Sequence, residues 1–525
     1  MSVASSGASC VRRFVGGVLL AVFVGACGNS TPTPSPTPTA AATATSQPTA
    51  TPIPTPTPSP TPASPVTFPI AVIVRYDDAR TAITPEALSA DIAAGKVVVP
   101  CEVTSLTLNK TALTIPPATA CTPAAEVTAG VYSKKLPMAL LPPGLVTPSI
   151  KVLAVGTADL FGSPSHRTVA YPLTAVAAVD PAWAFYSEAA VRTLISTGDT
   201  CPDRGVSYMA NTVKKGWDWV LSGGTAQYGG FKTTDLGWPA PIIARRNTNG
   251  AVAALISDND ISANDFECPV VKDAIQHNTG MVFEVDPRAV TLLAGKGGVK
   301  VVTLGSNHIT DGGRAGVLST VAYLDQAGIK HTGAGATLAD ALAPAVVNVR
   351  GIKFAFVGWD DITGSAAATD AHAGVAPMTD ANVCNSIKAA RKVADVVIAM
   401  PQWGWPEYHN DITPEQVAHR QMFYDCGADG VLGSGTHWAS WASILPGPNG
   451  PRFAIGSHGN FLFDQSWSRQ TMEGVIVEVT FVGTRLAQFR LHPYVIVQGA
   501  QPCLVDPAAD GAYVLHQVWS ASNIQ

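Results

Sequence analysis

The sequence lacks any run of apolar residues long enough to cross a bilayer. Phe14–Val24 is apolar but falls short of the roughly 20 residues that a membrane-spanning helix needs. The sequence also lacks an excess of positive charge, because 33 Lys and Arg stand against 38 Asp and Glu. The formal net charge of −5 argues against nucleic acid as a partner, since phosphate backbones bind basic surfaces.

The amino terminus is typical of an exported lipoprotein. Arg12-Arg13 precede the apolar run, which ends at the small residues Val24-Gly25-Ala26-Cys27. This resembles a bacterial lipobox, which implies removal of residues 1–26 and lipidation of Cys27. We therefore expect an outward-facing protein held on the bacterial membrane by lipid alone. The alternative is an ordinary secretory signal. Without the two arginines, the charge of −5 becomes −7.

Residues 27–66 are nearly all Thr, Pro, Ser and Ala and predict a polyproline-type tether, not a domain. Such a tether reaches on the order of 100 Å at ~3.1 Å per residue. No cysteine pair in the rest of the chain has the CxxC spacing of a zinc or redox site. In an export compartment, Cys101 could pair with Cys121, and Cys201 with Cys268 if their loops meet. Three further cysteines leave at least one thiol over: Cys384, Cys426 and Cys503.

Residues 67–182 predict a small α/β domain. Phe68–Val74, Val97–Val103 and Ile150–Val155 are expected as strands, and Thr84-Pro85-Glu86 opens a capped helix. This region is faintly similar to lobes of periplasmic solute-binding proteins, so a solute receptor is one reading. It contains no cluster of His, Asp or Glu, so a role in packing or recognition is the default.

The remainder, residues 183–525, alternates strands and helices, and strand after strand ends in polar residues. Parallel strands place such ends at one edge of a sheet, where α/β proteins bind ligands. The central example is Val301–Gly313, which opens with a short buried strand, breaks at Gly305-Ser306 and presents Asn307-His308 ahead of a helix. A tight strand-to-helix turn with Asp311 as helix cap is the alternative. The other expected strands are Ala189–Ser196, Ala253–Ile256, Phe354–Val357, Ala394–Met400, Gly430–Gly433 and Phe453–Gly456.

These strand ends resemble the CapA family of poly-γ-glutamate capsule proteins, within the calcineurin-like metallophosphoesterase superfamily. The resemblance follows the order and spacing of six motifs. They are Gly198-Asp199 with Arg204, Asp265-Phe266-Glu267, Ser306-Asn307-His308 with Asp311 and Gly313, Gln402-Trp403-Gly404 with Glu407-Tyr408, Ala428–His437, and Gly459–Asp464.

The resemblance implies a four-layer α/β/β/α sandwich with two mixed sheets, preceded by the smaller α/β domain. It also implies metal ligands at Asp199, Asp265, Glu267, Asn307, Gln402 and His437. The superfamily mechanism uses two cations roughly 3.5–4 Å apart to grip a phosphoryl group. In that scheme His308 is the general acid or the electrostatic partner of the leaving oxygen. Asp311 orients His308, and Arg204 holds an anionic substrate.

The sequence departs from the family where Gln402, Ser434 and Gly435 replace histidines and Asp265 replaces an asparagine. Losing imidazoles and gaining a carboxylate favours Mg²⁺, Mn²⁺ or Ca²⁺ over Zn²⁺. We expect one firmly held divalent cation and at most one weak one. His458 is a candidate replacement ligand.

Two functions stay open from these residues. One is a lipid-anchored hydrolase that acts on a phosphate ester or on the poly-γ-glutamyl polymer. The other is a degenerate, non-catalytic member that binds or organises an anionic surface polymer. The missing histidines favour the second function. The retained residues favour the first, which we prefer; they are Asp199, Asn307, His308 and Arg204.

Overall fold

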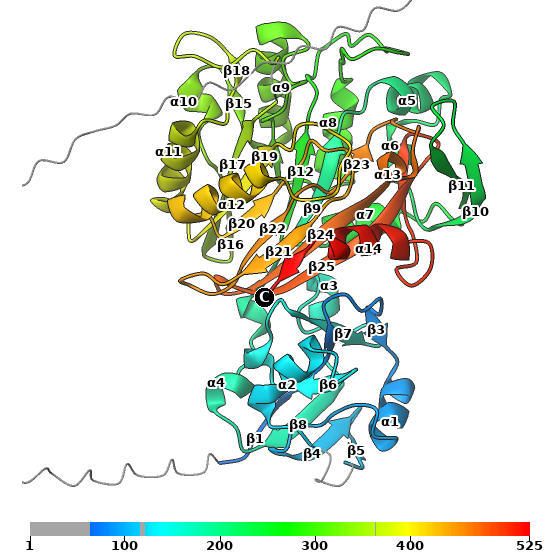
Figure 1. Ribbon diagram of the computed structural model, residues 1–525, viewed down its shortest axis with the longest axis vertical. Helices are drawn as coiled ribbons and strands as arrows, with labels where there is room; N and C mark the ends of the chain where they lie inside the picture. Colours follow the sequence, from blue (N-terminus) through cyan, green and yellow to red (C-terminus); the bar gives the residue numbers. More distant parts are fainter. Residues whose placement is uncertain (1–63, 116–120, 363) are drawn as a thin grey trace, which may run out of the picture. The chain divides into compact units, whose positions relative to one another are not determined.

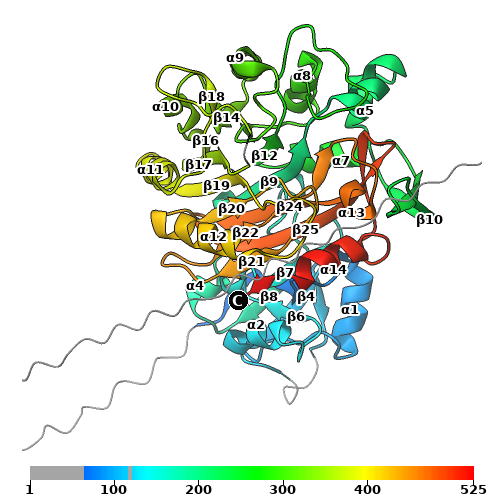
Figure 2. The ribbon, with the colours of Figure 1, turned by 45° about the horizontal axis from the view of Figure 1, so that its top comes forward.

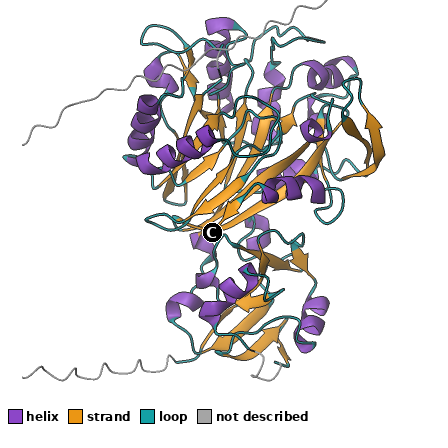
Figure 3. Cartoon of the chain, in the orientation of Figure 1, coloured by secondary structure: helices purple, strands orange, loops and turns teal. Residues whose placement is uncertain are grey.

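The computed structural model describes residues 64–115, 121–362 and 364–525 (Figure 3). The expected signal peptide, Cys27 and nearly all of the expected tether lie outside these residues. Within the described ranges, every helix is too short or too polar to span a membrane.

The amino-terminal region builds two four-stranded sheets, with orders β1-β8-β4-β5 and β3-β7-β2-β6. The strands are β1 (Val66–Pro69), β2 (Ala71–Arg75), β3 (Ala82–Ile83), β4 (Val103–Leu108), β5 (Thr111–Leu113), β6 (Ala139–Leu141), β7 (Ile150–Val155) and β8 (Leu173–Ala177). The helices are α1 (Pro85–Ala93), α2 (Ala124–Tyr132), α3 (Pro164–Arg167) and α4 (Pro181–Ala184).

Two predictions for this region have opposite outcomes. Helix α1 begins as expected, because the Thr84 side chain accepts a hydrogen bond from the Ala87 N–H. The predicted strand Val97–Val103 is wrong: only Val98 and Pro100 form isolated bridges, and β4 begins at Val103. Proline has no N–H for a strand ladder, and the chain turns immediately after Pro100.

The carboxy-terminal region is built on two larger sheets. The first has the order β14-β13-β12-β9-β24-β25-β26, with β23 beside β9. Its strands are β9 (Val191–Thr200), β12 (Ile261–Phe266), β13 (Val301–Thr303), β14 (Lys330–Thr332), β23 (Asn460–Leu462), β24 (Glu473–Val482), β25 (Arg485–Val497) and β26 (Gln501–Leu504).

The second sheet has the order β16-β17-β19-β20-β22-β21-β27. Its strands are β16 (Ala345–Val349), β17 (Ile352–Asp360), β19 (Val396–Gln402), β20 (Gly430–Leu432), β21 (Ala442–Leu445), β22 (Arg452–Ile455) and β27 (Asn523–Ile524). Two short pairings complete the strands: β10 (Ala226–Thr233) with β11 (Pro239–Arg245), and β15 (Ala334–Gly335) with β18 (Gly374–Val375).

Helices cover the outer faces of both sheets (Figures 1 and 2). The longest are α7 (Ala251–Ser257), α8 (Pro287–Gly295), α9 (Gly313–Ala327), α11 (Asp380–Arg391) and α12 (Pro414–Cys426), whereas α14 (Ala512–Ser520) packs its buried side chains into the core between the sheets. Short helical turns connect them: α5 (Arg204–Ser207), η4 (Tyr208–Thr212), α6 (Trp217–Val220), α10 (Leu338–Ala341) and α13 (Arg469–Met472).

The two sheets pack face to face, and alternation along the strands decides which side chains fill each layer. Leu194 of β9 joins Phe354 and Ile398 in the core between the sheets, whereas its neighbour Ile195 packs outward against α7–α9. On the far side, α11 and α12 cover β17 and β19. The four-layer α/β/β/α sandwich is therefore confirmed.

Ala253–Ile256, expected as a strand, lies in helix α7, and β12 follows at Ile261. A four-residue apolar run fits a buried strand and a buried helix face equally well, so its pattern does not separate them. Strands β9, β12 and β13 run parallel, as do β17, β19, β20 and β22. Their carboxyl ends carry the polar residues described next.

Candidate metal centre

Three buried side chains converge where the strands end. Asp199 lies near the end of β9, Glu267 directly follows β12, and His437 follows β20. One ligand atom from each lies within 4.8 Å of the other two, which is an arrangement that can hold a metal ion. The residues are 0 %, 0 % and 3 % exposed, respectively. The chain thus brings together three of the six predicted ligands most closely.

The pairing of β9 with β12 explains why the carboxylates of Asp199, Asp265 and Glu267 lie close together. Asp265 is the register partner of Asp199 across β12 and β9, and the Glu267 N–H donates to Thr200 O over 3.0 Å. The disulfide Cys201–Cys268 joins the same two segments just beyond the carboxylates. This pairing confirms the expectation that the two loops meet. Cys101–Cys121 also forms as expected, and Cys384 pairs with Cys426.

The carboxylate oxygens fit a cation because they lack other partners. Among the described residues, Asp199 Oδ2 lies 3.0 Å from His437 Nδ1, but no hydrogen bond reaches Asp199 Oδ1, either oxygen of Asp265, or Oε2 of Glu267. Burial raises the pKa of Asp265 and Glu267 well above the usual range, and the charge of Asp199 raises both further. Unpaired buried carboxylates are strongly unfavourable, and a divalent cation among them removes that penalty.

His437 is oriented by its neighbours so that one ring nitrogen stays open. Its Nδ1 lies 2.9 Å from Asn460 Oδ1 and 3.0 Å from Asp199 Oδ2. Burial lowers the pKa of the imidazole, but Asp199 and Glu407 outweigh burial and raise it overall. Holding one nitrogen on an acceptor and offering the other to a cation is the usual arrangement of a histidine ligand.

Gln402 and Asn307 lie beside these ligands, but they bond each other. Gln402 Nε2 donates to Asn307 Oδ1 over 2.7 Å and lies 3.4 Å from Glu267 Oε1. The Gln402 Oε1 atom is buried without a hydrogen-bond partner among the described residues. The predicted oxygen ligand therefore presents its nitrogen to Asn307 and Glu267, which are two of the other predicted ligands.

His308 and Asp311 form a pair, as their predicted roles require. His308 Nδ1 lies 2.9 Å from Asp311 Oδ2, and that carboxylate also accepts the Phe283 N–H over 3.0 Å. The Phe283 ring meets the imidazole edge-on, with centroids 4.7 Å apart. Asp311 thus fixes the orientation of a nearly buried imidazole and leaves its Nε2 for other contacts.

Arg204 is held by the protein itself. Its guanidinium pairs with Asp464, with Nε 2.9 Å from Oδ1, and its Nη1 donates to Gly280 O over 3.0 Å. It also lies over the rings of Phe283 and Phe463. Asp464 and Gly280 therefore already engage part of the guanidinium that is predicted to hold an anionic substrate.

Two residues with clear contacts at the site received no role from the sequence. Asn460 orients His437, and Asp464 anchors Arg204. Asn460 and Asp464 both lie in Gly459–Asp464, one of the motifs that carry the resemblance to the family. His458 donates from Nδ1 to Gly433 O over 3.0 Å, and burial lowers its pKa to about 4. Its Nε2 is buried without a partner among the described residues, but His458 lies outside the three-residue cluster.

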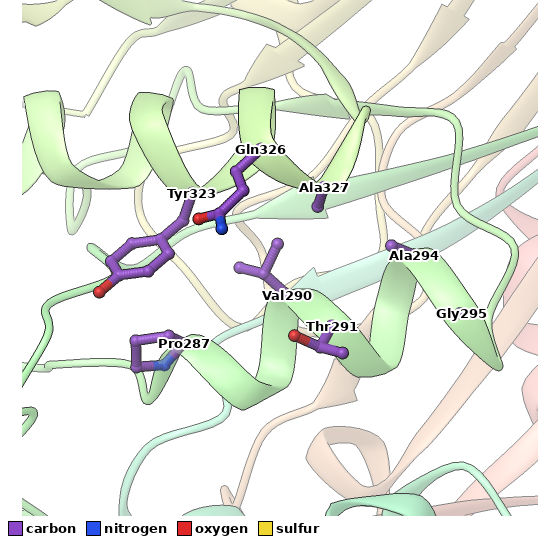
Figure 4. Close-up of a pocket in the computed structure, with 8 residues that line it drawn as sticks. All are labelled: Pro287, Val290, Thr291, Ala294, Gly295, Tyr323, Gln326 and Ala327. Atoms are coloured by element: carbon purple, nitrogen blue, oxygen red, sulfur yellow. The ribbon is translucent and has the colours of Figure 1, made fainter.

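A separate groove lies between α8 and α9 (Figure 4). It has a volume of about 590 Å³ and is lined by Pro287, Val290, Thr291, Ala294, Gly295, Tyr323, Gln326 and Ala327. Its lining contains neither carboxylates nor imidazoles, so the groove lacks the ligand types that meet at the strand ends.

The fold and the site together define a two-sheet α/β protein with a buried acidic centre at its strand ends. The family model described as "Bacterial capsule synthesis protein PGA_cap" matches residues 193–465, which is more than half of the sequence. The chain belongs to this family.

Curated relatives match over part of their length. The capsule biosynthesis protein CapA of Bacillus anthracis is 27 % identical over 275 residues, covering 51 % of this chain and 65 % of that protein. The PGA biosynthesis protein CapA of Bacillus subtilis (strain 168) is 27 % identical over 246 residues, covering 46 % and 63 %. The chain thus spans a little under two thirds of each relative.

Solved structures match more distantly. The NAD nucleotidase NadN of Haemophilus influenzae is 13 % identical, with a TM-score of 0.33, over 64 % of this chain and 57 % of that one. A hypothetical protein from Thermus thermophilus is 13 % identical, with a TM-score of 0.34, over 58 % and 100 %.

Proposed function

We propose that this chain is a divalent-cation-dependent hydrolase of the phosphoesterase type that serves poly-γ-glutamate or capsule polymer synthesis, retention or processing. The observation that carries the proposal is that Asp199 Oδ1 and Glu267 Oε2 are buried without a hydrogen-bond partner among the described residues, in one cluster with the imidazole of His437. The names of the two Bacillus relatives, a capsule biosynthesis protein and a PGA biosynthesis protein, support the link to capsule polymer.

The roles of the residues follow from their contacts. Asp199, Glu267 and His437 would hold the cation, and Asp265 adds negative charge beside them. When bound, the cation polarises a phosphoryl oxygen and lowers the pKa of water. His308, oriented by Asp311, donates a proton to the leaving oxygen. The preponderance of oxygen ligands favours Mg²⁺, Mn²⁺ or Ca²⁺ over Zn²⁺.

The test is turnover of an aryl phosphate and, separately, of an oligo-γ-glutamate by the full chain with Mn²⁺, Mg²⁺, Ca²⁺, Zn²⁺ or a chelator. We expect turnover with the hard cations, none with the chelator, and loss of at least about a hundredfold in Asp199→Ala and His308→Ala. Turnover that survives both the chelator and Asp199→Ala would contradict the proposal.

The second candidate is a non-catalytic member that binds an anionic surface polymer. The observation that favours it is the engagement of Gln402 with Asn307 and of Arg204 with Asp464, which occupies groups that a phosphoesterase uses. Cation-dependent retention of poly-γ-glutamate without any turnover, abolished by Asp199→Ala, would favour this candidate.

For the location of the protein, we propose a lipid anchor on Cys27 that faces outward. The lipobox-like Val24-Gly25-Ala26-Cys27 supports it. Cys27→Ala should release the protein from the membrane fraction and abolish labelling by a radioactive fatty acid. Membrane retention of the unlabelled variant would contradict a lipid anchor.

A further inference from the structure

A fourth carboxylate faces the open nitrogen of His437. Glu407 lies in the segment after β19, and its Oε2 is 4.0 Å from His437 Nε2. That separation is too long for a hydrogen bond. It is close to the span of two metal–ligand bonds of about 2.1 Å each, so a cation fits between the two atoms.

Glu407 differs from the other carboxylates in its access to water. Its side chain is 16 % exposed, whereas Asp199 and Glu267 are fully buried. Among the described residues, no Lys or Arg forms an ion pair with it, and His437 is its ion-pair neighbour. The pKa of the Glu267 carboxyl group is raised mainly by burial and by the charges of Asp199 and Asp265. The negative charge of Glu407 raises it further.

The residue next to Glu407 fixes the segment against the site. The Tyr408 N–H donates to Thr436 O over 3.0 Å, and the Tyr408 ring stacks on His437 with centroids 5.6 Å apart. Tyr408 and His437 both have left-handed backbones, with φ of 66° and 58°. Such conformations are costly for residues other than glycine and persist where neighbouring contacts hold them.

We propose that Glu407 is a further ligand of the cation, which closes the centre from its solvent side and thereby fastens the segment 403–410. The proposal rests on the proposed cation site of Asp199, Glu267 and His437. It also stands on the buried carboxylate oxygens there that have no partner among the described residues. Glu407 is carried by a connecting segment, whereas Asp199 and Glu267 lie at strand ends.

The test is the affinity of the metal-stripped full chain for Mn²⁺, measured by titration calorimetry. Glu407→Gln keeps the shape and removes the charge, and it should raise Kd at least about tenfold, since a charged ligand is lost. Glu415→Gln, an exposed residue in the first turn of α12, is the matched control and should leave Kd unchanged. Asp199→Asn should abolish binding.

The same samples give a second measurement, amide hydrogen exchange across residues 403–410. Mn²⁺ should slow exchange in the wild-type chain and in Glu415→Gln, but not in Glu407→Gln. Unchanged Kd and unchanged protection in Glu407→Gln, with binding lost in Asp199→Asn, would overturn the role of Glu407 and leave the cation site standing. Absence of Mn²⁺ binding by the wild-type chain would overturn both.

Discussion

Gln402 donates its side-chain amide to Asn307 Oδ1 over 2.7 Å, and the same nitrogen lies 3.4 Å from Glu267 Oε1. The amide group thus lies between two oxygens that a second cation would use as ligands. This arrangement agrees with one cation per chain in place of the pair that the superfamily mechanism employs.

Gln402→Glu should allow a second equivalent of Mn²⁺ to bind. The change replaces a hydrogen-bond donor with a carboxylate of the same shape, next to Asn307 and Glu267. Elemental analysis and calorimetry of the metal-loaded variant measure the stoichiometry. Gln421→Glu, on the exposed face of α12, is the matched control for added charge. An unchanged stoichiometry in Gln402→Glu would contradict this explanation.

The disulfide Cys201–Cys268 should position the ligands as well as stabilise the fold. Changing both cysteines to Ala frees the segments that follow Asp199 and Glu267, so we expect a Kd for Mn²⁺ raised at least about tenfold. Cys384–Cys426, which links α11 and α12, is the matched control and spans 42 residues, compared with 67 for Cys201–Cys268.

Both double variants should lower the unfolding temperature to a similar degree, because the stabilisation from a disulfide varies only slowly with loop length. Only the pair beside the ligands should weaken Mn²⁺ binding. Equal loss of affinity in the two double variants would mean that Cys201–Cys268 acts through general stability alone.

The ion pair between Arg204 and Asp464 should act mainly on stability. Both side chains are mostly buried, at 10 % and 20 % exposed, so Arg204→Ala should cost about 2 kcal/mol of unfolding free energy. Adding Asp464→Asn should cost little more, since the pair is already broken. Lys96→Ala breaks an exposed pair with Asp91 and serves as control, with a cost of about 0.5 kcal/mol or less.

Denaturant unfolding of five proteins measures these costs: the wild-type chain, Arg204→Ala, Asp464→Asn, the double variant and Lys96→Ala. Full additivity of Arg204→Ala and Asp464→Asn would show that the two side chains do not depend on each other. In that case Arg204 would be free to serve an anionic substrate, as its place in the sequence motif predicts.

Glu473 should make stability depend on pH. Burial raises the pKa of its carboxyl group from 4.5 to about 7, although Tyr228 and Arg469 bond it. Between these pH values the folded chain keeps a proton that the unfolded chain has lost, so the unfolding free energy falls as pH rises. The whole fall is on the order of 3 kcal/mol.

Glu473→Gln cannot titrate and should flatten this part of the profile. The measurement is the unfolding free energy of each protein at pH 4.5 and at pH 7, compared with the exposed control Glu86→Gln. An identical pH slope in Glu473→Gln and the wild-type chain would contradict the assignment.

The candidate site could be located from sequence because its residues follow strand ends. Asp199, Glu267 and Asn307 each come just after an apolar run, and parallel strands bring such positions together at one edge. The layer architecture was predictable through the family motifs. The predicted strand at Ala253–Ile256 failed because a run of four apolar residues has no period that distinguishes a strand from a helix.

The partners of the site residues were not predictable. Whether Gln402 offers its oxygen or its nitrogen depends on which atoms of Asn307 and Glu267 face it, and the pairing of Arg204 with Asp464 joins positions 260 residues apart. Neither relationship leaves a periodic pattern in the sequence. The pairing of Cys384 with Cys426 likewise follows from the packing of α11 on α12.

The most direct test of the central claim is anomalous diffraction at the manganese absorption edge from crystals of the protein grown with Mn²⁺. We predict one strong peak, bounded by Asp199, Glu267 and His437. The same peak should be absent from crystals of Asp199→Asn. A peak elsewhere in the molecule, or none at saturating Mn²⁺, would contradict the claim that these three residues form a cation centre.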